Sequence, residues 1–118
     1  MEARLAPPHS IIFVYDPSGA VEVPDDIGAG LVSATDSCVA VGTLAEMDGE
    51  TTIRLAPDFA APEGEIAFEG TIKTPGGTVA INTSLGEQVV AIPVGPAAHI
   101  TVWANDASEP DLILVRAR

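Results

Sequence analysis

The sequence is poor in basic residues, and this shortage restricts the partners that the protein is expected to bind. Its 118 residues include five lysines and arginines against seventeen aspartates and glutamates, which gives a formal net charge of −12. Negative charge of this size repels the phosphate backbone of nucleic acids and the anionic surface of membranes. We therefore expect neither as a partner, whereas a basic protein or a divalent cation suits the charge.

Cysteine is almost absent. Cys38 is the only one, so the chain cannot form an internal disulfide. It lies in the apolar run 37–41, where we expect a small buried side chain and not a nucleophile, which would need a neighbouring base. The chain also lacks a signal-peptide pattern and the ~20 consecutive apolar residues of a membrane-spanning helix. We therefore expect a cytoplasmic protein.

Motifs of enzymes and cofactor sites are absent as well. The sequence has no nucleophile elbow, no phosphate-binding loop and no dinucleotide-binding glycine pattern. The two histidines, His9 and His99, are far apart and have no carboxylate at helical spacing, so they do not predict a zinc site. We predict that the protein is not an enzyme and needs no cofactor. An enzyme would require a pocket in which His9 or His99 meets a carboxylate.

What fills the chain instead is a series of short runs rich in Val, Ile and Thr, each closed by Gly, Pro, Asn or Asp. Five of them lie between Gly64 and Arg118, and such runs are typical of successive strands. Earlier runs cover residues 10–15, 31–34, 38–43 and 50–55. We predict a single-domain, all-β antiparallel sandwich of about eight strands over residues 1–118. Residues 1–9, with two prolines, are predicted to be a loose lead-in.

Turn residues and alternation give more detailed expectations for the middle of the chain. Asp48-Gly49 predicts a hairpin over Thr43–Leu55, and the proline-bounded segment Ala56–Glu63 is long enough to cross between sheets. Four residues of the next strand share a face that is predicted to point inward, opposite Val79 and Ile81. These four residues are Ile66, Phe68, Gly70 and Ile72.

Three features of the outer surface remain open between a structural and a binding role. Trp103 is either core of a second face, which we favour, or an exposed interface anchor. Pro93 marks a strand end or an edge, because it cannot donate a backbone hydrogen bond. The run 11–15 is apolar on both faces, and with Pro93 it suggests a homodimer.

Two acidic clusters suggest a calcium site as an alternative function. The first, Glu46, Asp48 and Glu50, surrounds the Asp48-Gly49 turn, and a solvated hairpin tip is the interpretation that we favour there. The second is a loop with Asp106, Glu109 and Asp111. Loops at one end of a sandwich bind calcium in C2 domains, but neither cluster has the calcium-loop spacing.

The negative charge is concentrated in the first half of the chain. Residues 1–63 hold eleven acidic and two basic residues, net −9, whereas residues 64–118 hold six and three, net −3. A negative face of this kind can block a basic groove and accelerate association with it. A generic solvated surface is the other interpretation.

Hydrophobic runs and turns follow one another in a particular order in segments 68–79, 89–94, 99–106 and 109–115, with a weaker likeness at 13–16. In this order, over about residues 64–115, the chain resembles a bacterial family, the competence-associated inhibitors of the DNA-entry nuclease. The resemblance implies a small β-sandwich that binds and inhibits a nuclease, or a relative to which no role is assigned. The Trp-Pro step that usually follows the family's closing strand is missing after Val115, and no functional residue is transferred.

Charge, missing catalytic motifs and resemblance together lead to one functional hypothesis. We predict a non-enzymatic, acidic protein-binding module, an inhibitor or immunity-type protein for a basic partner such as a nuclease. The alternative is a C2-like calcium-binding sandwich that uses the two acidic clusters.

Overall fold

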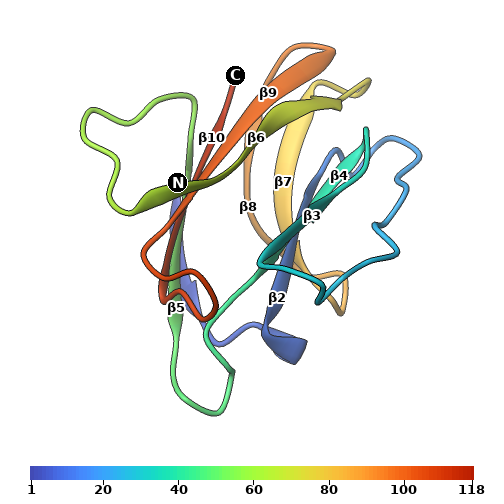
Figure 1. Ribbon diagram of the computed structural model, residues 1–118. Coiled ribbons are helices and arrows are strands. Elements are labelled where there is room, and N and C mark those ends of the chain that lie inside the picture. The colour runs from blue at the N-terminus through green and yellow to red at the C-terminus, as the bar shows by residue number, and fades with distance from the viewer.

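The computed structural model describes residues 1–118 as two packed β-sheets (Figure 1). Strands account for all the regular structure except one short 3-10 turn, η1 (Pro8–Ser10). None of the helical structure has the length and apolar character of a membrane-spanning helix. The strands are β1 (Glu2–Leu5), β2 (Ile11–Tyr15), β3 (Val32–Ala34), β4 (Cys38–Gly42), β5 (Thr51–Ala56), β6 (Glu65–Lys73), β7 (Thr78–Thr83), β8 (Gln88–Pro93), β9 (Ala97–Ala104) and β10 (Leu112–Ala117).

The sheets have five strands each. Sheet A has the order β1-β5-β10-β9-β6, and sheet B has the order β3-β4-β2-β7-β8. Every neighbouring pair is antiparallel except β5 and β10, which run parallel. The predicted all-β sandwich is therefore confirmed, and so are all five runs after Gly64. The strand count is ten and not eight, and one parallel pair interrupts the antiparallel pattern.

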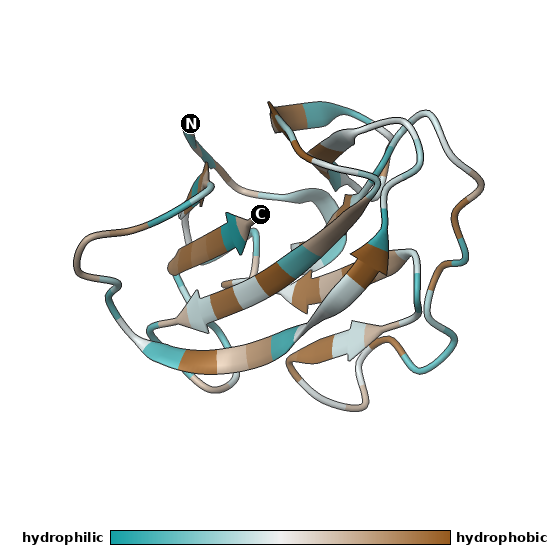
Figure 2. Ribbon diagram, turned by 90° about the horizontal axis from the view of Figure 1, so that it is seen from above, coloured by the Kyte–Doolittle hydropathy of each residue, from teal (hydrophilic) through white to brown (hydrophobic).

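Alternation along the strands builds the core between the sheets. In β2, Ile12 and Val14 are fully buried, while the alternate residues Ile11, Phe13 and Tyr15 are half-buried on the outer face. Figure 2 shows the same alternation of hydrophobic and hydrophilic residues along the longer strands. Seventeen buried apolar side chains, most of them Val and Ile, form one cluster. Each fully buried Val or Ile contributes about 1.5–3 kcal/mol to folding.

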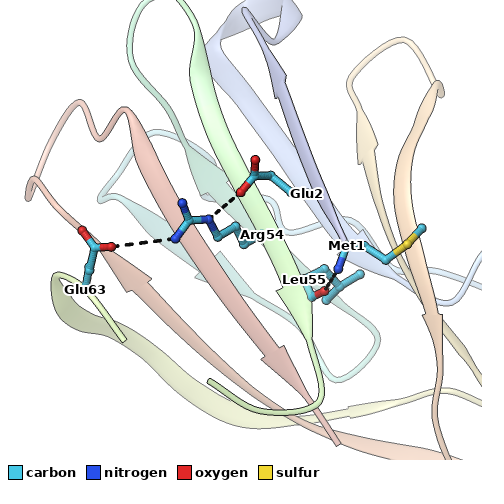
Figure 3. Close-up of polar contacts among 5 residues, drawn as sticks. All are labelled: Met1, Glu2, Arg54, Leu55 and Glu63. Atoms are coloured by element: carbon cyan, nitrogen blue, oxygen red, sulfur yellow. Dashed lines mark hydrogen bonds and ion pairs between the residues drawn. The ribbon is translucent and has the colours of Figure 1, made fainter. Parts of the chain in front are cut away.

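The first residues are a strand and not a loose lead-in. β1 pairs antiparallel with β5, and Glu2 lies opposite Arg54. The nitrogen of Met1 donates to the carbonyl oxygen of Leu55 at 2.8 Å, and the nitrogen of Leu55 donates back to Met1 at 2.8 Å (Figure 3). Four residues with only alternating apolar side chains give a weak local signal, so the partner strand decides this structure.

The predicted hairpin over Thr43–Leu55 is wrong. β4 belongs to sheet B and β5 to sheet A, so the Asp48-Gly49 turn lies in a connection that crosses the sandwich. The segment Ala56–Glu63 does the opposite of what was expected, because it joins two strands of sheet A. Turn residues fix where the chain reverses but not which sheet receives the next strand.

The segment between β5 and β6 covers the outer face of sheet A. Phe59 packs edge-on against Trp103, with ring centroids 6.1 Å apart and an interplanar angle of 81°. Trp103 is 8% exposed, and Leu114 beside it is 2% exposed. The expectation that Trp103 belongs to a second core is confirmed.

The two sheets approach each other closely along one edge of the sandwich and less closely along the opposite edge. β1 and β5 of sheet A contact β8 of sheet B, so the layers meet along that edge. Pro93 ends β8, an edge strand, as predicted. The opposite edges are β6 in sheet A and β3 in sheet B, and these strands diverge from one another (Figure 1). We call the β1–β8 side the closed edge and the β3–β6 side the open edge.

Candidate functional site

The largest hollow of the protein lies on the open edge. Its volume is about 620 Å³, within the range of ligand-binding clefts. Two adjoining hollows of 140 and 440 Å³ share Leu31 with it. We call the largest hollow the open-edge groove. Its walls are Leu31, Val32, the segment 64–67 at the start of β6, and the segment 104–107 after β9.

One contact holds the two sheets together at the far end of this edge. The backbone nitrogen of Lys73 donates to the backbone carbonyl oxygen of Asp36 at 2.7 Å, and the Lys73 ammonium group lies 3.1 Å from the Asp36 carboxylate. Ile72 is buried beside this contact. Toward Glu65 the strands separate, and the opening between them is the groove.

A β-bulge reorients the start of β6. Ile66 pairs with Trp103 and Phe68 with Val102, so Ala67 is the extra residue. Val102 points into the core and Trp103 away from it, which means that the bulge moves Ile66 to the outer side. Ile66 is 57% exposed. The prediction that Ile66 shares an inward face with Phe68 is therefore wrong, because a bulge reverses the alternation. Val79 and Ile81 pair with β2 and β8 in the other sheet.

Gly64 permits the close crossing that shapes this wall. Its φ is +89°, and a Cβ atom there would lie 2.5 Å from the carbonyl oxygen of Ala104. Only glycine tolerates both conditions without strain. The chain can therefore enter β6 directly against the end of β9, where the groove begins.

The charges around the groove have one sign. Its walls and those of the adjoining hollows contain Glu65, Asp106 and Glu109 but no lysine or arginine. None of these three carboxylates takes part in an ion pair. The groove is thus a partly apolar surface with an acidic rim.

The basic side chains are engaged elsewhere. Arg54 lies between two carboxylates, 2.7 Å from Glu2 and 3.8 Å from Glu63 (Figure 3). Arg4 lies 3.5 Å from Glu50. The Arg116 guanidinium stacks over Trp103, 5.3 Å from the ring centroid. These contacts occur on sheet A and at the closed edge, so they leave the groove without a counter-charge.

Asp106 is the rim carboxylate that accepts the most hydrogen bonds. It accepts hydrogen bonds from the backbone nitrogens of Glu109 and Ser108 and from the Ser108 hydroxyl, at 3.0–3.1 Å. These bonds hold the pKa of the Asp106 carboxyl below its usual value. In the same loop, Asp111 accepts from the Asn105 amide at 2.6 Å. Internal hydrogen bonds thus fix the loop that forms one wall.

The six carboxylates of the calcium hypothesis do not converge. No group of three His, Cys, Asp or Glu side chains is placed to hold a metal ion. The Glu46 carboxylate accepts a hydrogen bond from the backbone nitrogen of His9 at 3.4 Å, and Glu50 forms an ion pair with Arg4. Asp106, Glu109 and Asp111 lie in the loop between β9 and β10, and Asp48 is exposed in the loop between β4 and β5. The calcium hypothesis stays a prediction.

None of the candidate catalytic groups lines the open-edge groove itself, although His9 lines the adjoining hollow of 140 Å³. The His99 Nε2 atom lies 3.1 Å from a Glu69 carboxylate oxygen, but both side chains are largely exposed and line no hollow. The His9 Nδ1 atom contacts the Ser84 hydroxyl at 2.7 Å. Cys38 is fully buried, and burial raises the pKa of its thiol to about 12, so it is not a reactive thiolate.

Comparison with known proteins matches this architecture to two solved structures. No family model matches the chain, and no curated protein matches it in sequence. The chain is similar in fold to ComJ. The crystal structure of ComJ, an inhibitor of the DNA-degrading activity of NucA from Bacillus subtilis, gives a TM-score of 0.72 at 11% identity. The alignment covers 99% of this chain and 93% of ComJ.

The second structure is more distant. The product of crocagin biosynthetic gene J gives a TM-score of 0.53 at 12% identity, over 98% of this chain and 94% of its own. The sandwich that the sequence resemblance implied is thereby confirmed. At these identities the comparison concerns the fold.

Proposed function

We propose that the protein is a non-enzymatic binding module that inhibits a basic protein partner such as a nuclease. The observation that carries this proposal is the unequal pairing of its charges. Of seventeen acidic side chains, five take part in ion pairs, namely Glu2, Asp36, Glu50, Glu63 and Glu69, which leaves twelve without a basic partner. Three of the five lysines and arginines are already paired.

An unpaired excess of negative charge favours capture of a basic partner. The self-repulsion of unpaired carboxylates destabilises the isolated protein and is relieved when a positive surface approaches. Complementary charge also accelerates encounter and disfavours acidic competitors. The likeness to ComJ supports the inhibitor role, since that protein acts on the DNA-degrading activity of NucA.

The candidate reactive groups favour binding over catalysis. The His99–Glu69 pair is exposed, and Cys38 is buried with a raised pKa. We also propose a cytoplasmic location, which suits a free cysteine in a reducing compartment. Homodimerisation through the half-buried outer face of β2 stays a prediction, and sedimentation velocity over a range of concentrations tests it.

Inhibition of DNA cleavage tests the proposal directly. The purified protein is titrated into NucA and a panel of other basic nucleases, and cleavage of a labelled duplex is followed at low and at high salt. We expect saturable, stoichiometric inhibition of at least one nuclease, weaker at high salt because screening shortens the reach of the charges. An acidic nuclease serves as the matched control.

Binding is measured in parallel by calorimetry, so that a partner that binds without being inhibited is recognised. If no basic nuclease is bound or inhibited at low salt, the proposed function is wrong. If the acidic control is inhibited equally, charge is not the basis of recognition.

A further inference from the structure

We propose that the open-edge groove is the docking site of the partner, and that its occupant is an extended basic segment which adds as a strand to the free edge of β6. This inference rests on the proposed function and assigns to it a place and a mode of recognition.

The first argument is the unpaired backbone of β6. β6 is the outermost strand of sheet A and pairs on one side only, with β9. The backbone N–H of Lys73 points to the free side, where it donates to the carbonyl oxygen of Asp36. Since backbone groups alternate along a strand, Glu69 and Thr71 present their nitrogens to that same side, and neither has a partner there. A free edge of this kind is a template for another strand.

The second argument is the apolar surface beside that edge. Ile66 is 57% exposed, while Leu31 and Val32 are only half-buried on the opposite wall. A bulge and a glycine with a left-handed backbone hold Ile66 in this position. Alternate side chains of an added strand would cover these three residues, and such pockets give strand addition its specificity.

The third argument is charge, which selects the occupant. Glu65, Asp106 and Glu109 line the groove and its adjoining hollow, and no lysine or arginine does. A nucleic acid or an acidic peptide would be repelled. A second copy of this chain would bring a net charge of −12 to this acidic surface. A segment that alternates basic and apolar residues matches both the rim and the walls.

A synthetic peptide of alternating Lys or Arg and Val tests the site. We titrate it into the ¹⁵N-labelled protein and follow the backbone amide signals. Shifts are expected to concentrate at Leu31–Val32, Glu65–Thr71 and Ala104–Ala107. No binding, or shifts spread evenly over the acidic loops elsewhere, overturns the inference. A peptide N-methylated at alternate residues keeps the charge but cannot pair as a strand, so equal binding by that peptide also overturns it.

Matched variants separate the groove from general electrostatics. Glu65→Gln with Asp106→Asn removes two charges at the groove, and Asp48→Asn with Glu87→Gln removes two exposed charges elsewhere. We expect the first pair of substitutions to lower the affinity for the peptide roughly tenfold, and the second pair to lower it by less than about twofold. Glu65→Gln alone serves if the double variant does not fold. Equal weakening by both pairs contradicts a groove-specific site.

The apolar walls have a control of their own. Ile66→Ala is expected to lower the affinity for the peptide. Leu85→Ala, which truncates another exposed apolar side chain (65% exposed), is expected to leave the affinity unchanged. The same four variants are then tested against an inhibited nuclease. If inhibition occurs but is insensitive to the groove variants, the docking site is wrong and the proposed function stands. If no nuclease is bound while the peptide binds in the groove, the proposed function is wrong and the site stands.

Discussion

The two edges of the sandwich show opposite solutions to the same problem. At the closed edge, β1 is held by its ladder with β5, and Arg54 lies between the carboxylates of Glu2 and Glu63. At the open edge, Glu65 has no counter-charge and Ile66 is 57% exposed. Charges are therefore paired around Arg54 at the closed edge, whereas at the open edge a carboxylate is unpaired and an apolar side chain is exposed.

This difference shows where the protein has surface available for a partner. Proteins normally protect a free strand edge by charge, a bulge or a cover. β6 has the bulge and the charges, but it also keeps an apolar groove beside them. Local stability and binding capacity are thus divided between the two edges, and substitutions should affect them separately.

The largest expected effect comes from the same truncation at the two edges. Ile53 of β5 is fully buried, and Ile53→Ala should lower the free energy of unfolding by about 2–5 kcal/mol, because it leaves a cavity. Ile66→Ala should change it by less than about 0.5 kcal/mol. Guanidinium denaturation measures both. A comparable loss in the two variants would mean that the open edge is packed like the core.

A glycine substitution tests the wall of the groove. Gly64→Ala imposes a left-handed φ on alanine, at about 1–2 kcal/mol, and adds a clash with Ala104. Gly86→Ala imposes a similar φ of +83° with nothing within 4 Å, so it isolates the first cost. We expect Gly64→Ala to be the more destabilising by at least about 1 kcal/mol in thermal melting. Equal losses would show that the close crossing at Ala104 is not fixed.

Acid should act more strongly on a buried carboxylate than on the groove rim. Burial alone would raise the pKa of Asp16, but hydrogen bonds from Ser18, Gly76 and Thr78 outweigh it and keep the pKa below its ordinary value of 3.8. A lowered pKa contributes stability that is present above 3.8 and is lost as the pH falls through the lower folded value.

Denaturation midpoints across acid pH therefore distinguish two carboxylates with lowered pKa values. Asp16→Asn should cost about 1–3 kcal/mol at neutral pH and flatten the loss of stability in acid. Asp106→Asn should flatten it less, because Asp106 is exposed. A steeper acid dependence in Asp16→Asn than in the parent protein would contradict this assignment.

The ion pairs of the closed edge should matter little to stability. Arg54→Gln removes contacts to Glu2 and Glu63, but all three side chains are at least 39% exposed. We expect a loss of about 0–1 kcal/mol that shrinks further in high salt. Lys73→Gln, which removes an exposed pair near the open edge, is the matched comparison. A large loss in either variant would show that exposed ion pairs contribute substantially to the stability of this protein.

Calcium should give the smallest effect. The six candidate carboxylates form no group suited to a metal ion, so the melting temperature should not change when Ca²⁺ is added. A site filled at a hundred times its Kd would add about 2.7 kcal/mol, which is easily detected. A rise of that size, abolished by Asp106→Asn, would support the calcium hypothesis and argue against the rim as a protein-binding surface.

Several parts of the fold were readable from local pattern. The five runs after Gly64 are strands because alternation and turn residues agree there. Burial of Trp103 and the edge position of Pro93 were also predicted correctly. The failures share one cause. β1, the sheet change after Gly42 and the bulge at Ala67 each depend on a strand that is distant in sequence.

The candidate site shows the same division. Excess acid was visible, and Asp106 and Glu109 were singled out, although for a metal. The groove itself was missed, because Leu31 and Glu65 come together only through the two sheets. The one local sign was Gly64 before a strand, whose meaning depends on the position of Ala104.

The sequence by itself determined the strand content, the buried face of most strands and the sign of the surface charge, because side-chain alternation and ionisation are local properties. Tertiary structure alone decided which strands became neighbours, where the layers meet and where they separate. Strand pairing joins residues far apart in the chain, and a bulge shifts alternation without changing composition. The open-edge groove, on which the proposed docking depends, is a product of those long-range choices.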